Sequence, residues 1–279
     1  MTEYELADKV VLITGGTGGL GSATARALLA RGARVGIVDL HPNTPENAAR
    51  ISPSGVVAGF TADVCDRDAL NDAVAHICER FGRIDVVIAN AGIMGHGSTL
   101  RTMPAPAIDK VLAVNVNGAI NTVNAAMKQI VANQGQVVLI SSVFAFLNGM
   151  GAIPYAMSKA AVEQLGRGLR VELAQHGASA TTAYFSLIQT DMIRNGVDED
   201  PTIGKLLSRT TPRPLRKRLE PDQAAHAIVH AIEHRSPRVF RPARWTPLSV
   251  LRGVINPAID ARLARDLKVR ALLGKLEGR

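Results

Sequence analysis

The chain has 279 residues, of which 47% are hydrophobic and 20% are charged, and its formal net charge is +8. This length suits one large α/β domain. Two cysteines are too few for a disulfide framework, and neither has the partners or the spacing of a metal site, so we expect no metal. No apolar run approaches the roughly 20 residues of a membrane-spanning helix and no signal peptide precedes the first strand, so we expect a cytoplasmic protein.

The first elements expected along the chain are a short buried strand, Val10–Thr14, a glycine-rich turn and a helix over Ser22–Arg31. In this order, glycines let the backbone approach a ligand, and the first turn of the helix attracts a pyrophosphate. The glycine spacing fits two dinucleotide-binding patterns. A mononucleotide P-loop is disfavoured, because Ser22 follows Gly21 directly and the required lysine is missing. The cofactor-binding residues expected here are Gly15, Thr17, Gly18, Gly19, Leu20 and Gly21.

The second expected strand, Arg34–Asp39, ends in a carboxylate eighteen residues after Gly21. In dinucleotide-binding folds an acidic residue near this spacing binds the ribose hydroxyls of NAD. The same charge repels the 2′-phosphate of NADP, and the glycine turn contains no Arg or Lys to compensate. We therefore expect NAD rather than NADP as the cofactor.

A serine and a tyrosine–lysine pair stand out in the middle of the chain. Ser142 ends an apolar run, Val137–Ser142, that is predicted to be a buried strand, and open α/β sheets place functional side chains at such strand ends. Tyr155 and Lys159 are four residues apart and share one face of a helix. A free phenol loses its proton at about pH 10, and a neighbouring cation lowers that pKa. The pair therefore indicates acid–base chemistry at Tyr155.

With these motifs assembled, the sequence from residue 8 to about residue 240 resembles the classical short-chain dehydrogenase/reductase family. The resemblance implies a doubly wound, Rossmann-type parallel sheet of about seven strands with helices on both faces. The alternation of strand-like and helix-like segments points to the same parallel sheet. Beyond the glycine turn and Asp39, the cofactor-binding residues implied by the resemblance are Asp63, Val64, Asn90, Ala91, Gly92, Tyr155, Lys159, Ile188 and Thr190.

The resemblance also implies a catalytic tetrad of Asn115, Ser142, Tyr155 and Lys159. Tyr155 would donate or accept the proton, and Ser142 would hold the substrate oxygen. Lys159 would bind the nicotinamide ribose and lower the pKa of Tyr155. Asn115 would fix a water molecule that links Lys159 to solvent. Charge develops at the substrate oxygen during hydride transfer, so two hydroxyl groups at that position stabilise it.

One stretch departs from the family: Phe185 and Ser186 replace the usual Pro-Gly, so we expect a differently shaped loop beside the nicotinamide. The expected pocket side chains are apolar and include no clear Arg or Lys for a carboxylate or phosphate. This favours a lipophilic alcohol or ketone, such as a steroid, a terpenoid or a fatty-acyl chain. We expect Asp198–Leu219 to be a mobile lid. The residues expected to line the pocket are Ile93, Met94, Phe144, Phe146, Met150, Phe185, Leu187 and Met192.

The C-terminal region is strongly basic: residues 235–279 contain 11 basic and 3 acidic residues, which accounts for the whole net charge. We therefore divide the chain into a Rossmann-fold catalytic domain, residues 1–240, and a basic helical extension, residues 241–279. The extension could cover the substrate cleft, pack on a neighbouring subunit or lie on an anionic membrane surface. Nucleic acid is disfavoured, because the extension has one aromatic residue, Trp245, and no nucleic-acid motif.

Two long helices are expected over residues 104–133 and 155–176. In the family, the corresponding helices pack against their counterparts in another subunit, which implies a homodimer or homotetramer. The small residues that would allow close approach are Ala113, Gly118, Ala119, Ala125, Ala126, Ala160, Ala161, Gly166 and Gly168.

Together these observations predict an NAD(H)-dependent oxidoreductase that interconverts a lipophilic secondary alcohol and a ketone. Two other functions stay open. The chain could bind NAD as a sensor or scaffold without turnover, although its intact tetrad disfavours this. It could also be a membrane-surface protein that has kept the fold.

Overall fold

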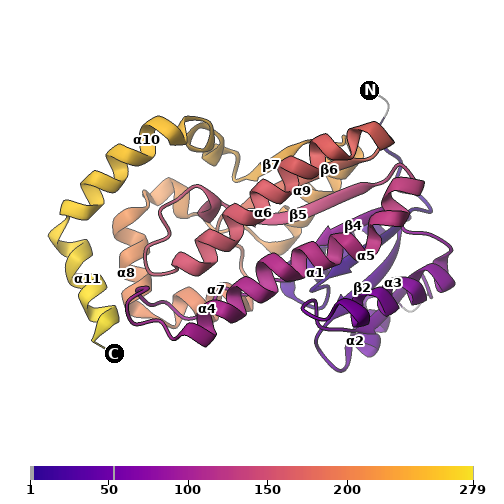
Figure 1. Ribbon diagram of the computed structural model, residues 1–279, viewed down its shortest axis with the longest axis horizontal. Coiled ribbons are helices and arrows are strands. Elements are labelled where there is room, and N and C mark those ends of the chain that lie inside the picture. Colours follow the sequence, from indigo (N-terminus) through magenta and orange to yellow (C-terminus); the bar gives the residue numbers. More distant parts are fainter. Residues whose placement is uncertain (1–2, 53, 279) are drawn as a thin grey trace.

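The computed structural model describes residues 3–52 and 54–278. Its centre is a seven-stranded sheet in the order β3-β2-β1-β4-β5-β6-β7, and every neighbouring pair of strands is parallel (Figure 1). The expected doubly wound parallel sheet is therefore confirmed. The strands are β1 (Val10–Thr14), β2 (Arg34–Asp39), β3 (Val57–Thr61), β4 (Val86–Ala89), β5 (Gln136–Ser142), β6 (Ser179–Phe185) and β7 (Arg238–Arg241).

Helices cover both faces of the sheet, so β1, β4, β5 and β6 are buried along their whole length. Helices α1 and α9 pack on one face, and α3, α5 and α6 pack on the other. The α-helices are α1 (Gly19–Leu29), α2 (Thr44–Ile51), α3 (Arg67–Phe81), α4 (Ala105–Leu112), α5 (Gly118–Ala132), α6 (Ile153–Glu172), α7 (Asp191–Ile193), α8 (Pro201–Thr210), α9 (Pro221–Glu233), α10 (Thr246–Arg265) and α11 (Leu267–Glu277).

The first two strands lie where the sequence predicted them, but some helix boundaries differ. Helix α1 begins at Gly19, three residues before the expected start, because the last glycines of the turn already form its first turn. The helix expected over 104–133 is interrupted by a π-helical turn, Ala113–Asn117, which separates α4 from α5. Such turns are frequent at functional sites. This one contains Asn115.

The C-terminal extension folds back over the part of the chain that follows β6. Helix α11 lies beside α8, on the side of the molecule away from β2 and β3 (Figure 1). Val269 and Leu276 of α11 are buried with Ile203 and Leu206 of α8 in one apolar cluster. Among residues 3–52 and 54–278, none of the helices has the length and apolarity needed to span a bilayer.

Ion pairs hold the extension in place at three points. Arg209 of α8 pairs with Asp266 (Nη2–Oδ2 2.7 Å), and Arg101 pairs with Glu277 (Nη2–Oε2 2.6 Å). Arg252 of α10 forms two hydrogen bonds to Glu163 of α6, at 2.9 and 2.7 Å. Several charges of the basic extension are therefore engaged with the same chain, next to the expected lid.

Candidate active site

All sixteen residues expected at the cofactor line one cleft at the carboxyl ends of β1, β2, β4, β5 and β6. In open parallel sheets, this edge is where ligands bind. The sequence did not identify Leu40, Lys110 or Asp191, which also line the cleft. These three residues belong to no sequence motif, so only the structure shows that they line the cleft.

The glycine turn leaves no room for side chains where the chain leaves β1. Gly15 has a φ of +66°, in the region that favours glycine. A Cβ on Gly21 would lie 2.3 Å from the carbonyl oxygen of Gly15, so any side chain would push α1 away from the turn. The close approach leaves the N-terminus of α1 facing the cleft, where its N–H groups and dipole favour a phosphate.

Asp39 points back at the glycine turn. Its Oδ2 accepts hydrogen bonds from the backbone N–H of Thr17 (2.9 Å) and from the hydroxyl of Thr17 (2.5 Å). The carboxylate is thereby fixed at the rim of the cleft, on the β2 side. The lysines that line the cleft, Lys110 and Lys159, lie on α4 and α6 rather than on the glycine turn.

Asn90 joins the ends of two neighbouring strands. Its amide nitrogen donates to the backbone carbonyls of Thr14 and Gly15, both at 3.0 Å. The hydroxyl oxygen of Thr14 lies 3.3 Å from the N–H of Asn90 and 3.4 Å from that of Ala91. These contacts tie the end of β4 to the end of β1 at the floor of the cleft.

Asn115 is buried in the π-helical turn, with 1% of its surface exposed. Its amide nitrogen donates to the carbonyl of Ile93 (2.8 Å) and to the hydroxyl of Ser158 (2.9 Å), and its Oδ1 accepts from the N–H of Ile93 (2.8 Å). Both amide protons are therefore used inside the protein. Any water held by this side chain must donate to the remaining lone pair of Oδ1.

Lys159 lies in the interior beside this asparagine. A Cβ on Gly92 would lie 3.2 Å from the Oδ1 of Asn115 and 3.4 Å from the Nζ of Lys159, so both groups surround the same glycine. The ammonium group donates to the carbonyl of Ile140 at 3.0 Å. Burial disfavours its charged form and lowers the pKa of Lys159 to about 8.

Tyr155 differs from the expectation based on the resemblance. Burial raises the pKa of the Tyr155 phenol, and a hydrogen bond with Ser142 opposes this rise; Lys159 makes no contribution. The physical reason is the position of the ammonium group, which lies 5.6 Å from the ring centroid of Tyr155 and points to Ile140. The predicted lowering by Lys159 is therefore absent from this arrangement.

Ser142 ends β5 in an extended conformation and begins a short 3₁₀ turn. Its hydroxyl oxygen accepts the N–H of Phe144 (3.2 Å), and its proton points to the carbonyl of Phe185 (3.3 Å). These contacts hold the hydroxyl group next to Tyr155. A substrate oxygen at this position would meet two hydroxyl groups on adjacent elements.

A second cavity adjoins the cofactor cleft, and four residues line both: Ser142, Tyr155, Ser186 and Ile193. Of the eight predicted pocket residues, Met94, Phe144, Met150 and Leu187 line this cavity. The prediction was wrong for three others, which line the cofactor cleft instead: Ile93, Phe185 and Met192.

The prediction that Phe146 lines the pocket was wrong for a different reason. It is buried in an aromatic cluster with Tyr184, Phe240 and Trp245. That cluster brings the C-terminal extension to the cavity wall, where the sequence also missed Arg216 and Trp245. No periodicity distinguishes Arg216 from the solvated arginines beside it.

The loop that carries Ser186 is tied to its neighbours. The N–H of Ser186 donates to the carbonyl of Arg241 (3.1 Å), and that of Gln189 donates to the carbonyl of Leu219 (2.9 Å). Arg218 pairs with Asp198 through bonds that include one of 2.7 Å, and these bonds lower the pKa of the Asp198 carboxyl. The expected lid thus has its two ends joined at its base.

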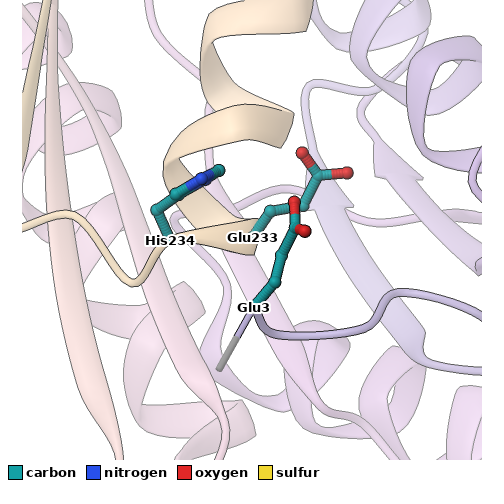
Figure 2. Close-up of side chains that lie close together, drawn as sticks. All are labelled: Glu3, Glu233 and His234. Atoms are coloured by element: carbon teal, nitrogen blue, oxygen red, sulfur yellow. The ribbon is translucent and has the colours of Figure 1, made fainter. Parts of the chain in front are cut away.

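One group of potential metal ligands occurs in the described part of the chain: Glu3, Glu233 and His234 (Figure 2). It lies at the end of α9, just before β7 begins, and hence at the opposite edge of the sheet from Tyr155. Glu233 is already paired with Arg31 (Nε–Oε1 2.8 Å), and the Nδ1 of His234 lies 2.8 Å from the carbonyl of His230. The group has no part in the cleft.

Comparison with known proteins gives a consistent result. A relative from Xanthobacter autotrophicus, 2-(R)-hydroxypropyl-CoM dehydrogenase, is 35% identical over 207 residues, covering 72% of this chain and 83% of the relative. L-rhamnose 1-dehydrogenase (NAD(P)(+)) from a Sphingomonas species is 31% identical over 229 residues, covering 80% and 89%. The crystal structure of levodione reductase superposes with a TM-score of 0.72 at 28% identity, covering 84% of this chain and 96% of that one.

The sequence model for the short chain dehydrogenase family matches residues 9–201, which is more than half of the chain and includes every residue that lines the cofactor cleft. With the parallel sheet, the glycine turn and the Ser142–Tyr155–Lys159 arrangement at its carboxyl edge, the match leads to one conclusion: this protein belongs to the short-chain dehydrogenase/reductase family of oxidoreductases.

Proposed function

We propose that the protein is an NAD(H)-dependent oxidoreductase that interconverts a lipophilic secondary alcohol and the corresponding ketone. One observation carries this proposal: Tyr155 and Ser142 lie where the cofactor cleft meets a second cavity with mostly apolar walls. Mostly apolar walls with a few polar groups are typical of sites that bind small organic molecules.

The residues of the cleft suit NAD, and the bound nicotinamide would supply hydride transfer. In alcohol oxidation the Tyr155 phenolate accepts the hydroxyl proton, and in ketone reduction the phenol returns it. Ser142 stabilises the oxygen on which charge develops. Lys159 supplies a positive charge beside the ribose position, and its lowered pKa lets it exchange protons just above neutral pH.

A binding protein without turnover is the rival function. Such a protein would need none of the three polar groups, from Ser142, Tyr155 and Lys159, that lie at the junction of the cavities. The hydroxyl groups of Ser142 and Tyr155 both open onto the junction, and the buried ammonium of Lys159 lies beside it. A buried charge without a carboxylate partner is costly for a scaffold, and such perturbed groups gather at catalytic sites. These contacts support the enzyme.

Replacing Tyr155 with Phe removes only the transferable proton. We expect turnover to fall by about 10²- to 10⁴-fold while NAD affinity stays unchanged, as is typical when a general acid–base group is lost. Tyr184→Phe is the matched control, because it removes the same atom from a buried tyrosine outside both cavities. The turnover of both variants is measured as steady-state oxidation of secondary alcohols, followed by NADH absorbance. If Tyr155→Phe lost less than tenfold in turnover, Tyr155 would not be the general acid–base group.

Asp39 should set the choice of cofactor. The substitution Asp39→Asn is the sharpest test, because an amide oxygen can still accept the two hydrogen bonds from Thr17 while the charge is lost. We expect wild type to prefer NAD over NADP in kcat/KM, and the variant to narrow that ratio by about tenfold, or about 1.4 kcal/mol. Equal efficiency of the wild type with both cofactors would contradict the proposal.

We infer that the protein is a homodimer or homotetramer in which α5 and α6 contribute to the interface between subunits. Not all of the small residues expected at this interface are available for it. Gly118 and Gly166 pack inside the subunit, since a Cβ there would lie 2.6 Å from Val64 and 2.1 Å from Thr182. On α6, Met157 and Val171 are instead exposed, at 54% and 76%, and suit a contact between subunits.

We also infer that residues 241–279 close the substrate cavity of their own chain and take no part in NAD binding. A chain ending at Phe240 lacks Trp245 and α11 but keeps the whole cofactor cleft. We expect its NAD affinity to stay within about threefold, its KM for lipophilic substrates to rise and its oligomeric mass to match that of the full chain. NAD affinity is measured by titration, KM by steady-state kinetics and oligomeric mass by light scattering. A monomeric full-length protein, or a folded truncated chain that cannot bind NAD, would overturn these inferences.

A further inference from the structure

The outward side of helix α10 is exposed along the whole length of the helix. None of its 20 residues is buried. Figure 1 shows α10 and α11 along one edge of the molecule, with α8 on the inner side of α11. Four of the nine large hydrophobic side chains that the described residues expose lie here: Val250, Leu251, Val254 and Leu267. Exposed apolar side chains that gather in one region mark an interaction surface.

The exposed residues of α10 form one stripe, because residues three or four positions apart share a face of a helix. Along this stripe the helix carries apolar residues first and arginines in its last turn, and no acidic residue shares the spacing. The stripe therefore combines an apolar surface with positive charge. Its members, all exposed, are Pro247, Val250, Leu251, Val254, Ala258, Ala261, Arg262 and Arg265.

The three acidic residues of the extension contact the rest of the same chain instead. Asp260 accepts a hydrogen bond from the amide of Asn148 (3.0 Å), and Asp266 and Glu277 form the ion pairs described above. The exposed cations of the extension form no ion pair among residues 3–52 and 54–278, so its free charge is positive. These cations are Arg244, Arg262, Arg265, Lys268, Arg270 and Lys275.

A bilayer surface with anionic headgroups matches both properties of the stripe. Apolar side chains of a surface helix enter the boundary between headgroups and acyl chains, while arginine and lysine reach the headgroup phosphates. A second copy of the chain matches less well. In a two-fold contact the same surface occurs on both sides, so the arginines of one stripe would find no carboxylate on the other.

We propose that α10 and the start of α11 attach the protein to the surface of an anionic membrane, with the stripe of α10 in contact with the lipid. The attachment goes beyond the proposed function and does not depend on it. Trp245, which directly precedes α10, lines the substrate cavity, so the attached protein would hold that cavity near the bilayer. Delivery of a lipophilic substrate from the bilayer would follow, and this step alone rests on the proposed function.

The attachment is tested by sedimentation of the full-length protein with vesicles, in the absence of NAD and substrate. One set of vesicles contains equal parts of phosphatidylserine and phosphatidylcholine, and the other contains phosphatidylcholine alone. We expect the partition coefficient to be at least about tenfold higher for the anionic vesicles, because each cation near an anionic surface adds to binding. The preference should fall as the salt concentration rises.

Two matched pairs of variants separate the stripe from the net charge. Leu251→Asp should weaken binding to the anionic vesicles by at least about tenfold, whereas Leu40→Asp, an exposed leucine next to β2, should weaken it by less than about threefold. The double variant Arg262→Gln/Arg265→Gln should likewise lose at least about tenfold. Its control removes the same charge from two exposed arginines of α2 and α3 and should lose less than about threefold: Arg50→Gln/Arg80→Gln.

Circular dichroism checks that each variant folds, and Leu251→Ser with Leu40→Ser replaces the first pair if Leu251→Asp does not. A wild type that stays in the supernatant with both kinds of vesicle would overturn the proposal. So would an equal loss in the two members of a pair, since binding would then depend on net charge alone. If the wild type does not bind vesicles and Leu251→Asp changes the oligomeric mass in light scattering, the stripe contacts a second copy of the chain instead.

Discussion

The buried ammonium group of Lys159 is the constraint around which the active site is arranged. Lys159 is 5% exposed, and its ammonium group donates a hydrogen bond to the carbonyl of Ile140. No carboxylate among the described residues is paired with it, so burial lowers its pKa to about 8. An uncompensated charge in the interior is stable only when the surrounding fold fixes it, and here α6, β5 and the Asn115 turn do so. The same charge would then be available to a ribose bound in the cleft.

The architecture explains why that charge lies beside both ligands. Parallel strands end at one edge, so β1 and β2 bring the glycine turn and Asp39 to the cleft, and β5 brings Ser142. The second cavity is completed by segments after β6, with Arg216 on the lid and Trp245 on the extension. Ion pairs such as Arg209–Asp266 keep the extension on its own chain. Cofactor chemistry and substrate recognition therefore depend on different parts of the sequence.

Local motifs were sufficient to predict the cofactor cleft, because glycine, Asp39 and Tyr155–Lys159 each act through spacing along the chain. The substrate cavity was harder, since its walls come from segments far apart in sequence. Phe146 has the composition of a pocket residue but packs into an aromatic cluster, and Arg216 looks like a solvated charge but belongs to the cavity wall. The pKa of Tyr155 also escaped prediction, because helix spacing does not reveal that the ammonium group turns toward Ile140.

The most direct test of the proton-transfer account is the pH dependence of kcat, measured for alcohol oxidation and for ketone reduction with the same protein. Burial lowers the pKa of Lys159 to about 8 and raises that of Tyr155, so Lys159 loses its proton just above neutral pH and Tyr155 loses its proton only in the alkaline range. Oxidation needs the deprotonated form and should speed up as pH rises through this range, whereas reduction needs the protonated form and should slow down. Two profiles that run in the same direction, or an oxidation rate that falls as pH rises, would contradict the account.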